Sequence, residues 1–259
     1  MLDHASVSPN SPGFPDHPHR GQETISYILS GKLEHEDFAG NRGMLTAGSL
    51  QFMTAGRGIM HSETPLPGDD GTANEGLQLW VDLPKEKKMC APRYRDLHSS
   101  EIQEVIADAG RVKIRVISGV SNGVQSQQDL TYTPIWYFDC TVKPGGTIKQ
   151  LLPQGWNAFA YVMAGDLIVS GSQRATKQFD IVTLSQDGDG FEASVPAHYA
   201  TEARFILVAG QPLNQPVVQY GPFVMTSRAE IEQAVSDFRM GENGFERAAT
   251  WASRATKRL

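Results

Sequence analysis

Four residues near the start of the chain have the types and the spacing of a metal site. The stretch FPDHPHRG, residues 14–21, places His17 and His19 two positions apart. The stretch GRGIMHSE places His61 and Glu63 at the same spacing. Side chains two residues apart on a strand point to the same face, so each pair can direct two ligand atoms to one place. Three imidazoles and a carboxylate suit a mononuclear Fe, Mn, Ni, Cu or Zn site with positions open for water or substrate.

A simpler interpretation of these residues is also open. A lone His-x-His pair is more often a surface or turn feature than a set of metal ligands. Here three of the seven histidines fall in the two pairs His17/His19 and His61/Glu63, and both pairs lie in Gly-rich contexts typical of strands. The combination favours the metal site, provided that the two strands are neighbours.

Short alternating stretches must position these residues. ETISYILSG, residues 23–31, places Ile25, Tyr27 and Leu29 on one face of a predicted strand. Similar stretches follow along the chain: GLQLWVDLP, RVKIRVISG, PIWYFDCTV, NAFAYVMAGDLIVSG and ARFILVAGQPL. Turn signals such as Pro144-Gly145-Gly146 separate them. Many short strands with Gly and Pro turns predict an all-β sandwich or jelly roll.

The domain organisation is predicted from breaks in this pattern. The N-terminal MLDHASVSPNSPG is polar and predicted to be a loop. The segment SSEIQEVIADAG, residues 99–110, is polar, faintly helical and closed by Gly110, which suits a linker between domains. A weak internal echo relates GQETISYILSG and GSLQFMTAGRG to GWNAFAYVMAGD and LSQDGDGFEAS. We therefore expect one domain over residues 1–98 and a second over 111–259.

The C-terminal region has helical rather than strand periodicity. Ser227 and Glu230 have the spacing of a capping box, and apolar residues follow at helical intervals from Ile231 to Phe238. This pattern predicts an amphipathic helix that ends near Gly241. The following GENGFERAATWASR is predicted to form a short second helix.

Composition excludes several classes of function. The chain has 259 residues and a formal charge of −6 without a basic run, which argues against direct nucleic-acid binding. Cys90 and Cys140 are far apart and form no CxxC motif, so neither a disulfide framework nor a thiolate zinc site is expected. No stretch has the character of a signal peptide or membrane span, so we expect an intracellular protein without membrane association.

The motifs resemble those of known families. His17-x-His19-xxx-Glu23, followed by Gly56-x-Gly58-xx-His61, resembles the two cupin motifs. The longer strings FPDHPHRG, HEDF, QFMTAGRGIMHSE, GLQLWV, GPFVM and NGFERA resemble the pirin family over nearly the whole chain. The resemblance implies two tandem cupin (jelly-roll) β-sandwiches with a short C-terminal helical segment. Pirins carry further residues before FPDHPHRG, so the first domain is expected to lack its earliest strands.

The pirin resemblance also implies a specific metal site. The ligands fall on His17, His19, His61 and Glu63, and the implied metal is one Fe(2+) per chain, held in the first domain. In the second half the stretch TIKQLLPQGWNAF has no histidine or acid where the first motif would place its histidines. Glu23 occupies the carboxylate position of ordinary cupins. An unbroken strand would turn Glu23 to the same face as His19. An interruption of the strand at Gly21 would instead leave Glu23 to support the ligands without binding the metal itself.

Three functions are compatible with such a site. The resemblance implies a quercetin 2,3-dioxygenase acting on flavonols. The spacings place no acid beside the histidines other than Glu63 and Glu23, so Glu63 is our candidate both for a metal ligand and for the base that takes the substrate hydroxyl proton. The resemblance equally implies an iron-dependent regulator that binds transcription factors, placed in the nucleus, the cytoplasm or both. A purely structural metal is the poorest fit, because this ligand set leaves coordination positions open. The protein is expected to be a monomer.

Overall fold

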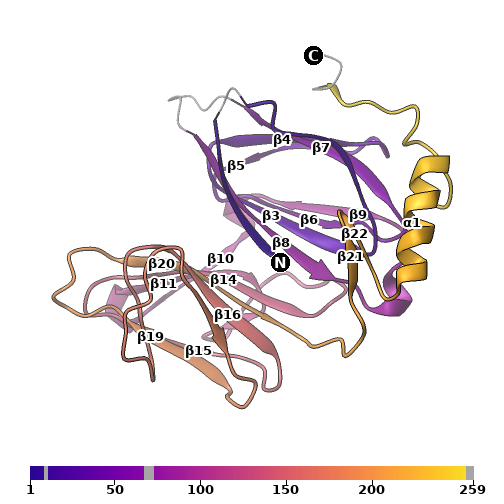
Figure 1. The fold of residues 1–259 in the computed structure, drawn as a ribbon. Helices are drawn as coiled ribbons and strands as arrows, with labels where there is room; N and C mark the ends of the chain where they lie inside the picture. Colours follow the sequence, from indigo (N-terminus) through magenta and orange to yellow (C-terminus); the bar gives the residue numbers. More distant parts are fainter. Residues whose placement is uncertain (9–10, 67–72, 255–259) are drawn as a thin grey trace. The chain divides into compact units, whose positions relative to one another are not determined.

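The computed structural model describes residues 1–8, 11–66 and 73–254, which form two compact units (Figure 1). Unit 1 contains Met1–Glu101, Thr131–Thr133 and Asn214–Leu259. Unit 2 contains Ile102–Leu130 and Pro134–Leu213. The chain therefore returns to unit 1 after building unit 2. This division differs from the predicted one, in which everything after residue 110 belonged to the second domain.

Unit 1 is built mainly from two antiparallel sheets. Over the described residues, the larger sheet has the order β1 (Leu2–Val7), β8 (Asn74–Asp82), β3 (Gln22–Ser30), β6 (Leu50–Thr54) and β9 (Arg93–Leu97). The other sheet has the order β2 (Phe14–His19), β7 (Ile59–Leu66), β4 (Lys32–Asp37) and β5 (Arg42–Thr46). β3 is almost entirely buried because it lies centrally in its sheet, between β8 and β6.

The N-terminal residues form a strand instead of the predicted loop. β1 pairs with β8 in the register Leu2↔Leu79 to Val7↔Asn74. Its own sequence is too polar to indicate a strand. The edge of β8 supplies the hydrogen-bonding partners, so a contact between distant segments overrides a weak local preference.

Unit 2 repeats the plan of unit 1. In the described chain its larger sheet has the order β10 (Gln103–Ala107), β11 (Val112–Ser118), β14 (Ile135–Val142), β20 (Ala203–Gly210), β16 (Asn157–Ala164) and β18 (Ile181–Leu184). A smaller sheet has the order β15 (Thr147–Leu151), β19 (Gly190–Ser194) and β17 (Ile168–Val169), and β12 (Val120–Ser121) pairs with β13 (Val124–Gln125). The neighbours β14-β20-β16-β18 correspond to β1-β8-β3-β6. This correspondence confirms the predicted all-β class with two tandem sandwiches.

Two details of the repeat differ from the predictions. Residues 103–107 of the expected linker form β10, which pairs with β11 and buries Val105 in the core of unit 2. One-turn 3-10 helices at Ser99–Glu101 and Asp108–Gly110 flank that strand. The counterpart of β6 is β18, because β6 pairs with β3 and β18 pairs with β16, the counterpart of β3, whereas the expected LSQDGDGFEAS contributes β19.

The C-terminal helix forms as predicted but packs within unit 1. α1 (Arg228–Met240) has Ser227 as its N-cap, and the Ser227 hydroxyl accepts a 3.2 Å hydrogen bond from the Glu230 backbone amide. Gly241, with φ +69°, is the C-cap. α1 follows the hairpin of β21 (Val218–Tyr220) and β22 (Phe223–Met225). Ile231 and Ala234 pack on the aromatic side chains of that hairpin and of the following turn. Residues 241–253 form turns and irregular structure, so the predicted second helix is absent from this described stretch.

A further 3-10 turn at Lys85–Lys87 follows β8.

No helix in residues 1–8, 11–66 and 73–254 has both the length and the apolar character needed to cross a membrane.

Candidate metal centre

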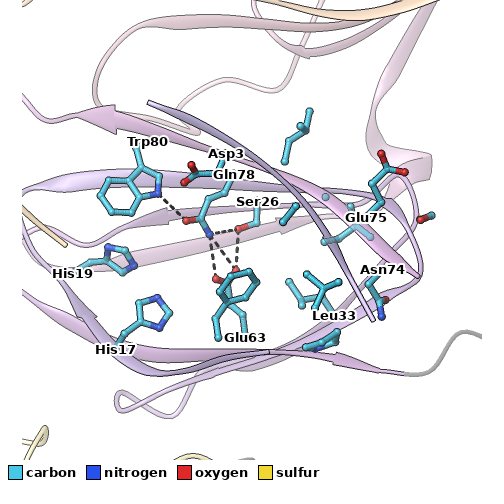
Figure 2. A pocket seen from close by; sticks show the side chains of 18 of the residues that line it. Asp3, His17, His19, Ser26, Leu33, Glu63, Asn74, Glu75, Gln78 and Trp80 are labelled. Carbon is cyan, nitrogen blue, oxygen red and sulfur yellow. Dashed lines mark hydrogen bonds between the residues drawn. The ribbon is translucent and has the colours of Figure 1, made fainter. Parts of the chain in front are cut away.

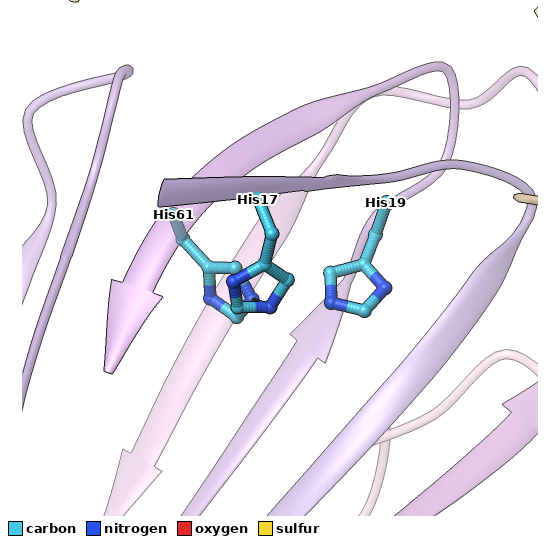
Figure 3. A group of neighbouring side chains, drawn as sticks. All are labelled: His17, His19 and His61. Atoms are coloured by element: carbon cyan, nitrogen blue, oxygen red, sulfur yellow. Dashed lines mark hydrogen bonds between the residues drawn. The ribbon is translucent and has the colours of Figure 1, made fainter. Parts of the chain in front are cut away.

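Three of the four predicted ligands converge at one place. His17 and His19 lie on β2, and His61 lies on the adjacent β7, with His17 and His61 directly opposite in the register. One potential ligand nitrogen from each ring lies within 4.8 Å of the others (Figure 3). Nε2 of His17 is 2.9 Å from Nε2 of His61. The pairing of β2 with β7 thus supplies the neighbouring strands that the spacing required.

The remaining ring nitrogens of the two β2 histidines have polar neighbours. His17 Nδ1 donates a 2.7 Å hydrogen bond to the Pro15 carbonyl, which leaves the Nε2 lone pair available to a cation. Gln22 Nε2 lies 2.7 Å from His19 Nδ1 and orients that ring. Metal binding through His19 Nε2 requires the ring proton on Nδ1, which the Gln22 amide oxygen would accept after the amide turns over. Gln22 was not predicted from the sequence. The sequence signal that could have indicated it is its position directly after Gly21, where the strand path is interrupted.

Burial keeps two of the histidines neutral. His19 is 1% exposed, and burial, reinforced by the nearby His17, lowers its pKa to about 3. Burial also lowers the pKa of His61 well below the ordinary value, with His19 and His17 adding to the effect. Neutral imidazoles offer the lone pairs that a divalent metal requires.

One buried ring nitrogen of His19 indicates whether the three histidines fit a metal ion. His19 Nε2 is buried without a hydrogen-bond partner in the described part of the chain. Buried polar atoms are nearly always paired, so this nitrogen needs a partner of another kind. A cation shared with the two nearby imidazoles satisfies it, and the residues present therefore fit a metal ion.

A pocket of about 410 Å³ opens beside the histidines (Figure 2). His17 and His19 lie at one end with Trp80, whose ring meets His19 edge-to-face at 5.3 Å between centroids. The other lining residues include the apolar Ala5, Val7, Phe14, Ile28, Leu33, Pro65, Leu77 and Pro222, and polar residues such as Asp3, Glu63 and Glu75. Its size is that of a site for a small organic ligand.

Glu63 lies in the wall of this pocket. Its carboxylate accepts a 3.0 Å hydrogen bond from Ser26 Oγ and a 3.1 Å hydrogen bond from Gln78 Nε2. Gln78 Oε1 in turn accepts from Trp80 Nε1 at 2.8 Å. Glu63 is not in the group of three converging residues, so its role as fourth ligand stays a prediction. Ser26 and Gln78 are functional candidates that sequence reasoning missed, although Ser26 lies within the strand ETISYILSG.

Glu23 points away from the histidines. Gly21 has φ +78°, which interrupts the strand path between His19 and Glu23. The Glu23 carboxylate accepts a 2.6 Å hydrogen bond from Thr54 Oγ1 and bonds of 3.0–3.3 Å from backbone amides at 132 and 133. Burial raises the Glu23 pKa, and these hydrogen bonds oppose the rise. In this structure Glu23 anchors the chain segment 131–133, and ligation by Glu23 is not required.

Unit 2 has an apolar interior where unit 1 has its histidines. β15, the counterpart of β2, carries no histidine or acid over Thr147–Leu151. Phe138, Phe191 and Phe205 are buried in the core instead. His198 is exposed, and within the described residues it belongs to no potential ligand group.

Acid is expected to destabilise the metal-free protein through His19. In the unfolded chain an imidazole binds its proton near pH 6.5, whereas folded His19 does so only near pH 3. The unfolded state therefore binds more protons between these values, so stability is fully present above about pH 6.5 and is lost as pH falls toward about 3. Urea unfolding of the metal-free protein at pH 7.5 and 5 measures this loss. His19→Gln should reduce it, and an equal loss in both proteins would contradict the assignment.

Family models match both halves of the chain. The model described as "Pirin" matches residues 2–81, and the model described as "Pirin C-terminal cupin domain" matches residues 137–244. Human Pirin is 44% identical over 243 residues, covering 93% of this chain and 81% of the human protein. Pirin-like protein 2 of Arabidopsis thaliana is 44% identical over 257 residues, covering 98% and 77%.

Solved structures show the same architecture. Quercetin 2,3-dioxygenase from Acinetobacter baumannii is 31% identical, covers 93% of this chain and 84% of its own, and superimposes with a TM-score of 0.83. A bacterial pirin from Escherichia coli in complex with nickel(II) is 19% identical, covers 82% and 81%, and has a TM-score of 0.62, a likeness of fold. The two family models and the near full-length identity to named pirins establish that this chain belongs to the pirin family of cupin-fold proteins.

Proposed function

We propose that this protein is a metal-dependent dioxygenase that acts on flavonols such as quercetin. The observation that carries the proposal is the convergence of three histidines, two of which, His17 and His19, line a pocket that is also lined by Glu63. The similarity to a structure named quercetin 2,3-dioxygenase supports the same substrate class.

The metal would be held by His17, His19 and His61, with Glu63 as the predicted fourth ligand. Iron(II) is the metal that the family resemblance implies, and affinity order alone would favour copper or zinc. When bound, such an ion supplies a Lewis acid with open positions for substrate oxygen atoms.

The pocket would orient a flat aromatic substrate. Side chains such as Ile28, Leu33 and Leu77 offer apolar surface for the fused rings and exclude water around them. The 3-hydroxyl and neighbouring ketone of a flavonol would then face the histidines.

Glu63 would take the proton of the substrate hydroxyl. Ser26 and Gln78 hold the carboxylate in the pocket wall by donating hydrogen bonds to its oxygen atoms. Trp80 fixes the orientation of Gln78 by donating to the amide oxygen. The chain thus positions a base in the wall of the substrate pocket.

Metal analysis of protein isolated from its own cells, combined with oxygen-uptake measurements, tests the proposal. We expect one metal ion per chain and oxygen uptake coupled to loss of flavonol absorbance. His198→Ala should leave both unchanged, because this exposed residue has no partner ligands in the described chain. Two ions per chain, one of them lost in His198→Ala, would contradict the assignment. A folded, metal-loaded protein without turnover would exclude the oxygenase.

One observation favours a regulatory function as the alternative. The residue after His19 is Arg20, whose side chain bonds to Asp237 on α1, while Arg228 and Met240 of that helix are exposed. The metal state can in this way influence a surface that a transcription factor could bind, in the nucleus or the cytoplasm. Partner binding that follows the oxidation state of the metal, without turnover, would select this function.

A further inference from the structure

Arg20 joins the candidate metal centre to the C-terminal segment. It directly follows His19, and its side chain is 1% exposed. Arg20 Nη1 donates a 2.6 Å hydrogen bond to Asp237 Oδ2 on α1, and Nη2 donates a 2.8 Å bond to the Asn243 carbonyl. Nε donates a 2.6 Å bond to the Arg57 carbonyl. The guanidinium is thus held on three sides.

The same contacts reach the strand that carries His61. Arg57 lies in the turn that leads into β7, two residues before Ile59. A Cβ atom at the next residue, Gly58, would lie 2.9 Å from the ring of Phe245, so this turn packs tightly on the C-terminal segment. Phe245 is fully buried, and its ring centre is 4.7 Å from the Arg20 guanidinium carbon. Both strands that supply the three histidines therefore rest on residues 237–245.

The hairpin before α1 holds the other side of the β2–β3 turn. The Val224 amide donates a 3.0 Å hydrogen bond to the Arg20 carbonyl. The Pro222 carbonyl accepts a 3.3 Å bond from Gln22 Nε2, the same amide that contacts His19. Buried Lys88 donates 2.8 Å bonds to the carbonyls of Gly21 and Val224. Residues 222–245 thus hold the β2–β3 turn around Arg20 by hydrogen bonds from both backbone and side chains.

Asp237 is the charged anchor of this arrangement. It is 1% exposed, and its second oxygen, Oδ1, accepts from Gln233 Nε2 at 2.7 Å and from Asn243 Nδ2 at 2.9 Å. These bonds fix the carboxylate against Arg20. Removing it would leave a buried guanidinium without its counter-charge, and Arg20 would have to move to regain water or another acceptor. Because His19 is its neighbour in the chain, that movement displaces a candidate ligand.

We propose that Asp237 is a positioning residue for the metal centre. Through Arg20 it holds the backbone of His19 and the turn before β7, so the C-terminal segment sets the separation of the three imidazoles. This inference rests on the proposal that the histidines hold a metal ion. It assigns to α1, which begins more than 160 residues after His61, a part in building the metal site.

Binding of Co(2+) to the metal-free full-length protein tests the inference without an activity assay. Asp237→Ala is expected to weaken Co(2+) binding by about tenfold or more, the lower end of the effect of outer-shell partners of metal ligands. The visible absorption spectrum of bound Co(2+) should also change, because it reports coordination geometry. Asp237→Asn keeps the shape and part of the hydrogen bonding, so it should give a smaller effect in the same direction.

Asp139→Asn is the matched control. Asp139 is 4% exposed and pairs with Arg204 at 2.7 Å within unit 2, so its loss breaks a comparable ion pair that has no contact with Arg20. Even where urea unfolding shows that Asp139→Asn loses as much stability as the Asp237 variant, its Co(2+) affinity and absorption spectrum should match those of the parent protein. Parent-like affinity and spectrum in folded Asp237→Ala, or equal weakening in Asp139→Asn, would overturn the inference.

Two further outcomes separate this inference from the proposed function. If Asp237→Ala does not fold, Asp237→Asn decides, and parent-like Co(2+) binding in that variant would overturn the positioning role. A parent protein that binds no Co(2+) or other divalent metal would overturn the proposed metal function and this inference with it. Normal metal binding by the Asp237 variants would overturn the inference alone.

Discussion

Glu63→Gln is expected to slow flavonol consumption by about 100-fold or more, the typical reach of general-base catalysis, while much of the metal stays bound. Glutamine keeps the shape of the side chain and an oxygen donor, but it cannot take the substrate proton. Ser26 can still donate to the amide oxygen, so the side chain should remain in the pocket wall. Oxygen uptake and flavonol absorbance are to be followed on samples matched for metal content.

A control for this prediction is Glu192→Gln, the same change on an exposed residue of unit 2 that pairs only with Lys149 among the described ion pairs. It should turn over at the parent rate. A Glu63→Gln variant with near-parent turnover would exclude Glu63 as the base. A variant that loses its metal along with activity would instead favour ligation as the main role of Glu63.

His61→Ala is expected to remove most of the bound metal. The substitution deletes one of three converging imidazoles, and in the described chain no other histidine belongs to the group that could replace it. The loss in affinity should exceed the roughly 10–100-fold that removing a hydrogen-bonding partner of a ligand costs. Metal analysis after dialysis against a chelator measures the outcome, and parent-like retention would refute the site.

Glu23→Ala separates the two possible acidic ligands. Because the Glu23 carboxylate is engaged with Thr54 and with the backbone of residues 132 and 133, its loss should lower the free energy of unfolding and leave metal content largely intact. Glu63→Ala serves as the comparison on the same assay. Should Glu23→Ala empty the site while Glu63→Ala retains metal, the ordinary cupin ligand set would be right and the pirin set wrong.

Much of the fold follows from patterns that act over a few residues. Alternation in ETISYILSG and NAFAYVMA indicates β3 and β16, because strand geometry repeats every two residues. The capping residues Ser227 and Glu230 mark the start of α1 for an equally local reason. The same period of two places His17 with His19 on one face of β2. Spacing alone therefore indicated these three elements and the histidine pair on β2.

Pairings between distant segments could not be obtained in this way. The polar residues of β1 and β10 become strands only because a neighbouring sheet edge supplies hydrogen-bonding partners. Glu23 leaves the face of His19 because Gly21 adopts a positive φ, and the Val224 carbonyl packs so closely against Gly21 that a Cβ atom there would collide with it. Local periodicity contains no information about either contact.

The sequence by itself determined that this chain is built from β-sandwiches and that three histidines and an acid lie at ligand spacing. Only the tertiary structure decided that Glu63, and not Glu23, lines a pocket with His17 and His19, and that α1 belongs to unit 1. The physical reason is the range of the interactions. Side-chain direction on a strand is set by neighbours two residues away, whereas the ion pair of Arg20 with Asp237 joins residues 217 positions apart and exists only once the sheets have closed around it.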